Sequence, residues 1–92
     1  MLTVDDYLSV GFVQDSKNAK IVTYTLSERK FEEEGGYQRR TLYLWLGNQP
    51  TFNLMVINQG ECEVLDAVKI DFPSTVKQLK ALIFGLGGVE IP

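Results

Sequence analysis

The sequence predicts an α+β fold: an antiparallel β-meander of four or five strands with a short N-terminal helix and a C-terminal amphipathic helix packed on the sheet. Three observations predict this class. Residues 41–60 carry no charged side chain and contain two apolar stretches joined by a turn sequence at 47–50, which is typical of a hairpin. Residues 19–26 are rich in β-branched and aromatic side chains. Residues 76–86 place apolar side chains at helical spacing.

Length and composition predict a single compact domain over residues 1–92. Hydrophobic residues make up 45% of the chain and charged residues 23%, which is ordinary globular usage. A net charge of -3 is too mild to select a class of partner. Asp5 and Asp6 stand where a signal peptide would be apolar, and no apolar stretch approaches the roughly 20 residues of a membrane-spanning helix. We therefore expect a cytoplasmic protein that is not bound to a membrane.

The residue types most used in catalysis are nearly absent. The chain has no histidine and one cysteine, Cys62, which rules out a Cys/His zinc site, a histidine-dependent triad and a disulfide within one chain. Glu61 and Glu63 flank Cys62, and neighbouring negative charges disfavour a reactive thiolate. We therefore predict a protein that is not an enzyme, with no catalytic residue, cofactor or metal ion.

The N-terminal segment carries the signals of a short helix. Thr3 and Asp6 match a capping box, Leu2 and Tyr7 match a hydrophobic staple, and Gly11 supplies a stop about two turns later. A first strand is expected to begin near residues 12–13, with a turn at 15–18 before the strand over 19–26. In that strand the side chains of Val22, Tyr24 and Leu26 share one face, which we expect to meet the core.

Residues 27–40 carry eight charges and two adjacent glycines, which predicts an exposed loop or an extended hairpin tip. The alternative interpretation is a recognition loop in which basic side chains contact phosphates and a tyrosine stacks on a base. The residues of this possible recognition loop are Arg29, Lys30, Tyr37, Arg39 and Arg40.

The central hairpin is apolar on both faces. Leucines alternate with Tyr43 and Trp45 in its first strand, so both faces of the sheet carry apolar side chains that need another element or chain packed on them. If Leu46 pairs with Thr51, then Tyr43 and Trp45 share a face with Phe52, Leu54 and Val56. In the other register they share it with Met55 and Ile57. From the first register we predict a protein interface formed by Tyr43, Trp45, Phe52 and Leu54. The alternative is that the N-terminal helix covers this second face and completes an ordinary monomer.

The last strand is expected over residues 61–72. Asp66 interrupts its apolar face, and we predict a β-bulge near Asp66 because bulges cost less than a buried carboxylate. The C-terminal helix follows, with Thr75 and Gln78 as a capping box and Gly85 as its stop. Its apolar stripe, expected to pack on the sheet, consists of Val76, Leu79, Leu82, Ile83 and Leu86.

These features favour a small non-enzymatic protein that binds another protein, as a homo-oligomer, an assembly factor or an inhibitor. Small chains of this kind are often accessory proteins of bacteria or phages, which is an association with size. The alternative is a nucleic-acid-binding module that uses residues 27–40. The balance of six basic against four acidic residues between Lys17 and Arg40 makes this a weak electrostatic site.

Overall fold

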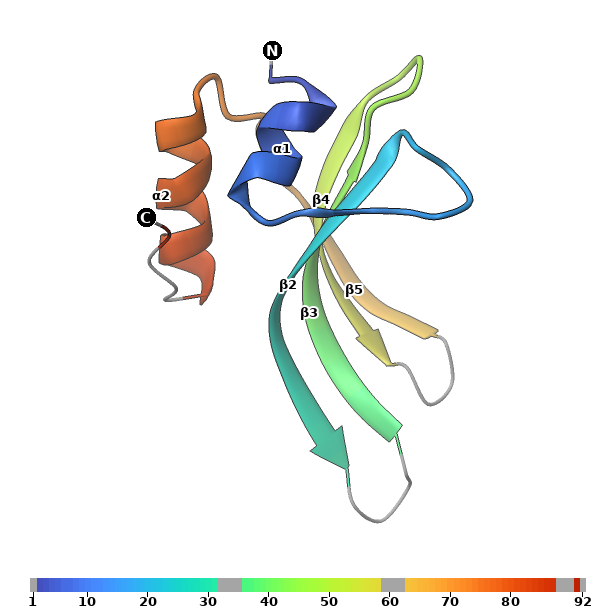
Figure 1. Ribbon diagram of the computed structural model, residues 1–92. Coiled ribbons are helices and arrows are strands. Elements are labelled where there is room, and N and C mark those ends of the chain that lie inside the picture. Colours follow the sequence, from blue (N-terminus) through green and yellow to red (C-terminus); the bar gives the residue numbers. More distant parts are fainter. Residues whose placement is uncertain (1, 32–35, 59–62, 88–90, 92) are drawn as a thin grey trace.

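Seven elements form one antiparallel sheet and two helices (Figure 1). The computed structural model describes residues 2–31, 36–58, 63–87 and 91. The sheet has five strands in the order β1-β2-β3-β4-β5, and each strand is antiparallel to its neighbour, so the predicted α+β meander is confirmed. The elements are α1 (Val4–Val10), β1 (Val13–Gln14), β2 (Ile21–Phe31), β3 (Gly36–Trp45), β4 (Thr51–Asn58), β5 (Glu63–Lys69) and α2 (Val76–Gly87).

Helix α1 begins and ends where local signals place it. The Asp6 backbone N–H donates to Thr3 Oγ1 at 3.3 Å, and the Thr3 N–H donates to Asp6 Oδ2 at 2.8 Å, which completes the predicted capping box. Gly11 ends the helix with φ 119°, a left-handed conformation that favours glycine, and its N–H donates to the Leu8 carbonyl.

The charged segment 27–40, predicted as an exposed loop or an extended hairpin tip, belongs largely to strands β2 and β3. Residues 27–31 and 36–40 are paired strand residues, so the structure shows the extended hairpin and not the exposed loop at these positions, while residues 32–35 lie outside the described ones. A bulge that the sequence did not indicate interrupts the ladder between Thr25 and Ser27. There the Thr41 hydroxyl donates to the Tyr24 carbonyl at 3.0 Å. Ladder hydrogen bonds do not depend on side-chain polarity, which explains why charged residues continue the strands.

The β3–β4 register differs from the one on which the predicted interface rests. Trp45 lies opposite Thr51 and Leu44 lies opposite Phe52, so the pairing of Leu46 with Thr51 is wrong. The Leu46 N–H instead donates to the carbonyl of Lys20, just before β2, at 2.8 Å. This register places the Phe52 ring in the core, and in a half-buried sheet the face that is buried decides the register.

The predicted bulge in β5 is confirmed. Val56 lies opposite Asp66 and Ile57 lies opposite Val64, so Leu65 is the extra residue. Asp66 lies on the helix side of the sheet, opposite Val56, and is exposed there, as is Val68 (52%), so its exposure does not depend on the bulge. Residues 61 and 62 of the predicted strand lie outside the described residues.

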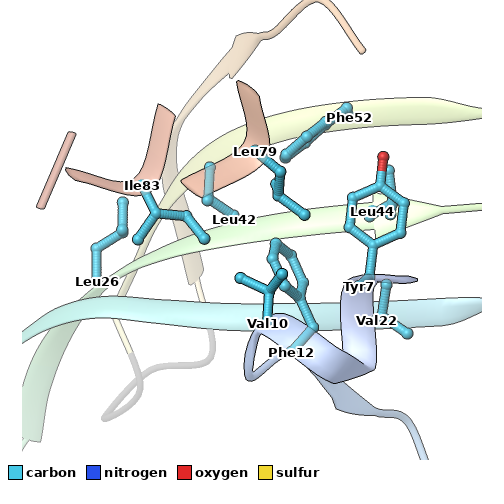
Figure 2. Packing of buried hydrophobic residues seen from close by; sticks show 10 residues of the cluster. All are labelled: Tyr7, Val10, Phe12, Val22, Leu26, Leu42, Leu44, Phe52, Leu79 and Ile83. Atoms are coloured by element: carbon cyan, nitrogen blue, oxygen red, sulfur yellow. The ribbon is translucent and has the colours of Figure 1, made fainter. Parts of the chain in front are cut away.

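Both helices pack on the same face of the sheet. Tyr7 from α1 and Leu79 and Ile83 from α2 are fully buried, and they meet sheet residues that are also fully buried (Figure 2). The Tyr7 ring packs edge-on against Phe12 and Phe52, with ring centroids 5.2 Å and 6.3 Å apart. The alternative in which the N-terminal helix covers the second face is therefore wrong. One shared cluster buries more apolar surface than two thin layers would.

Helix α2 presents the predicted stripe to the sheet but extends beyond its predicted end. Leu79 and Ile83 are fully buried, and the other stripe residues are half-buried. The Gln78 N–H donates to Thr75 Oγ1 at 3.1 Å, while the Gln78 side chain accepts from the N–H of Ser74 at 2.8 Å. Gly85 as the stop is wrong, because the helix continues to Gly87. A Cβ atom at Gly85 would meet no other atom within 4 Å, so nothing in the packing requires a glycine at this position. One glycine inside a helix lowers stability by only about 1 kcal/mol, which the helix tolerates.

We expect Tyr7→Phe to stabilise the protein. The Tyr7 hydroxyl is buried without a hydrogen-bond partner among the described residues, and burial, followed by the Asp6 charge, raises the pKa of Tyr7 above its ordinary 10.0. Removing an unsatisfied hydroxyl should raise the free energy of unfolding by about 1–2 kcal/mol in chemical denaturation.

The raised pKa also gives the sign of a pH effect. Folding favours the neutral phenol of Tyr7, so its raised pKa contributes to the free energy of unfolding. This contribution is complete below the pKa of Tyr7 in the unfolded state and is lost as the pH rises through its pKa in the folded state. Tyr7→Phe should therefore lose less stability than the wild type above pH 10. A destabilised variant would show instead that the hydroxyl has a partner in solution.

Candidate functional site

The side of the sheet away from α1 and α2 has no helix or strand packed on it in the described part of the chain; we call it the uncovered face (Figure 1). The register defines its members, because side chains directly opposite in an antiparallel pair share a face. Its central residues are Ile21, Thr23, Thr25, Thr41, Tyr43, Trp45, Asn53, Met55, Ile57 and Ala67.

The centre of the uncovered face is uncharged and largely apolar. Tyr43, Trp45, Met55 and Ile57 are half-buried. The apolar surface continues to the edges of the sheet, where Val64 is 52% exposed beside Ile57. Depletion of charge with enrichment of aromatic residues and methionine is the composition of the centre of a protein interface.

The structure separates the four predicted interface residues. Tyr43 and Trp45 lie on the uncovered face, but Phe52 is fully buried and Leu54 half-buried on the helix side. Their grouping is therefore wrong, and the other register, with Met55 and Ile57 beside the aromatic residues, is the one observed. Val64 was missed as a member of this face, because only the bulge at Leu65 turns its side chain towards it.

The Trp45 indole packs against the chain that leaves β3. A Cβ atom on Gly47 would overlap the six-membered part of the indole, so only glycine fits beneath the ring. This close approach fixes one side of the indole against the protein.

Charged side chains gather at the other end of the same face. Arg39 lies directly opposite Glu28, with its Nη2 3.9 Å from Glu28 Oε2 and 3.4 Å from the Tyr37 hydroxyl. The guanidinium carbon is 5.5 Å from the centroid of the Tyr37 ring, in cation–π geometry. The side chains of Arg39 and Glu28 are 32% and 37% exposed, so this long ion pair contributes under about 1 kcal/mol.

The five residues of the possible recognition loop do not form one surface. Lys30, Tyr37 and Arg39 lie on the uncovered face, whereas Arg29 and Arg40 lie on the helix side. Arg40 Nη2 is 3.4 Å from the Leu86 carbonyl, so its guanidinium donates to the C-terminal turn of α2. A cation there also interacts favourably with the helix dipole, which gives Arg40 a structural role.

Other kinds of site are weakly represented among the described residues. No three His, Cys, Asp or Glu side chains lie close enough together there to hold a metal ion. Among the described residues, a cavity of about 300 Å³ on α2 is lined by Lys80, Ala81, Phe84 and Ile91. None of the described helices is both long and apolar enough to cross a membrane.

Comparisons with protein-family models, with curated proteins and with solved structures found no match to this chain. The fold and the face define a small α+β protein with one sheet face in the core and the other open.

Proposed function

We propose that this protein is not an enzyme and works by binding a protein chain through the uncovered face. A homo-oligomer is the form tested first, and an assembly factor or an inhibitor would use the same surface. One observation carries the proposal: a contiguous apolar face across the sheet, centred on Tyr43 and Trp45, on which no described element packs. We place this activity in the cytoplasm.

Leaving the apolar side chains of this face in water costs free energy. Each square ångström of apolar surface that is removed from water contributes about 25 cal/mol. Tyrosine and tryptophan are also the side chains that most often dominate binding energy, because they bury a large rigid surface with little loss of conformational entropy. Covering Tyr43, Trp45 and Met55 with another chain is the simplest way to gain this energy.

Nucleic-acid binding remains the alternative proposal, with less support. Of the basic residues that it needs, only Lys30 and Arg39 share a face with Tyr37, and Glu28 beside Arg39 offsets part of their charge. A site of two cations would bind phosphates weakly and only at low salt.

Fluorescence of Trp45 tests the proposal, because it is the single tryptophan of the chain. We expect acrylamide to quench its emission less at high than at low protein concentration, since association buries the ring. Tyr43→Lys should remove the concentration dependence, whereas Phe84→Lys, on the exposed side of α2, should keep it. Equal quenching of the wild type at every concentration would argue against association through this face.

A further inference from the structure

We propose that two copies stack their uncovered faces with opposite strand directions, so that Arg39 of each copy packs on the Trp45 indole of the other. This inference rests on the proposed function and adds the partner and its orientation.

The two ends of the uncovered face are complementary to each other. Arg39 and Trp45 lie on the same strand, β3, and their odd-numbered positions place both side chains on the uncovered face. Six residues separate them, which is about 20 Å along a strand. Lys30 joins Arg39 at the cationic end, and Ile21 joins Trp45 at the aromatic end, because each pair of neighbours is set by the β2–β3 register. The positions between these ends are uncharged.

Two-fold symmetry selects the orientation. In an isologous pair, if Arg39 of one copy meets Trp45 of the second, the reverse contact forms as well. Opposite strand directions bring these ends together and keep the two cationic ends apart. Stacking with the same strand direction would place Arg39, Lys30 and Glu28 of both copies at one end, where two groups of net positive charge meet and no cation reaches Trp45. Lys69 lies on the edge strand β5, from which its ammonium can reach water.

Arg39 has unused binding capacity. A guanidinium carries five N–H donors, and the Arg39 side chain is 32% exposed, with long contacts from its Nη2 to Glu28 (3.9 Å) and to the Tyr37 hydroxyl (3.4 Å). The Tyr37 ring already holds the guanidinium in a cation–π contact. Tryptophan is the best aromatic partner for such a cation, and desolvation between two sheets strengthens the contact.

The size of the face predicts a weak dimer. Strands β2 to β5 at a spacing of about 4.8 Å give a footprint of roughly 20 Å by 20 Å. Standard stable interfaces bury about 800 Å² of accessible surface on each partner, so this face lies at the low end of that class. We therefore expect dissociation in the micromolar range, as is usual for small interfaces.

Site-specific cross-linking tests the orientation. In a Cys62→Ser background, the variants Arg39→Cys and Trp45→Cys are prepared separately, mixed, and treated with a thiol reagent that spans about 10 Å, the distance between packed sheets. We expect cross-linked dimers in the mixture and at least tenfold fewer with either variant alone. A mixed dimer keeps one intact Arg39–Trp45 contact, so the substitutions do not abolish the pair under test.

The outcomes separate this inference from the proposed function. Dimers that cross-link between the two copies of position 39, or between the two copies of position 45, would overturn the proposed orientation. They would still support binding through the uncovered face. A protein that is monomeric at every concentration would show that a second copy of the chain does not bind the uncovered face. As an independent check, Trp45→Lys should weaken dimerisation at least tenfold, and the added substitution Arg39→Glu should restore it by pairing opposite charges. Absence of this rescue in folded protein, as judged by circular dichroism, would contradict the proposal.

Discussion

Phe52→Ala should lower the free energy of unfolding by about 3–5 kcal/mol, the usual cost of truncating a buried aromatic side chain. Phe52 is fully buried, and its ring centroid lies 6.3 Å from that of Tyr7 and 6.0 Å from that of Phe72. It therefore joins α1, the sheet and the segment after β5. A domain of this size has roughly 5–14 kcal/mol of stability in total, so the variant should show a much lower denaturation midpoint in urea.

Met55→Ala is the matched control for Phe52→Ala. Met55 lies on the same strand but on the uncovered face, where it is only half-buried. Under dilute conditions its truncation should cost about 1 kcal/mol or less, because little apolar surface and no closed cavity are involved. A larger loss for Met55→Ala than for Phe52→Ala would mean that β4 is turned over and that the other register is correct.

Leu79→Ala should lower the free energy of unfolding by about 2–5 kcal/mol. Leu79 is fully buried in the centre of the face that α2 presents to the sheet, so its removal leaves a cavity between the helix and the sheet. Thermal denaturation followed by circular dichroism measures the effect as a fall in the melting temperature. The size of the fall reports how firmly α2 closes the helix side of the sheet.

Phe84→Ala provides the comparison on the same helix. Phe84 is 54% exposed on the side of α2 away from the core, and its truncation should change stability by about 0.5 kcal/mol or less. If Phe84→Ala lowered stability as much as Leu79→Ala, α2 would be rotated about its axis relative to the structure, and the helix side of the sheet would be packed differently.

The helix ends could be predicted from the sequence because they depend on local rules. The contacts of Thr3 with Asp6 and the left-handed Gly11 involve residues within one or two turns of each other. A bulge near Asp66 was predicted from the cost of burying a carboxylate, but the observed bulge at Leu65 turns Val64, and not Asp66, to the other face. The end of α2 could not be predicted, because glycine inside a helix costs little and Arg40, distant in the sequence, donates to its last turn.

The sequence did not determine on which face of the sheet each aromatic side chain lies. It depends on a register that differs by one residue between the two alternatives, and a slip of one residue reverses every side chain. The hydrogen bond from Leu46 to the Lys20 carbonyl, which takes Leu46 out of the hairpin ladder, joins residues that are distant in the sequence. Equally, no local signal indicates that α1 packs beside α2 and leaves the second face open.

The charged end of the uncovered face depends on one unpredicted feature. Without the bulge between Thr25 and Ser27, the β2–β3 pairing would place Arg29 on the uncovered face and Glu28 on the helix side. The extra residue reverses this arrangement and brings Glu28 beside Arg39. Charge composition alone therefore could not show that the predicted recognition loop divides between two faces.

Static light scattering across a dilution series, on the wild type and on Trp45→Lys, tests most directly whether a second chain covers the uncovered face. Lysine is chosen over glutamate because a glutamate at this position could pair with Arg39 of the second copy. We predict a wild-type mass that falls from dimer to monomer on dilution through the micromolar range, a monomeric Trp45→Lys, and wild-type behaviour for Phe84→Lys. A monomeric wild type at every concentration, or a Trp45→Lys dimer as stable as the wild type, would contradict the account.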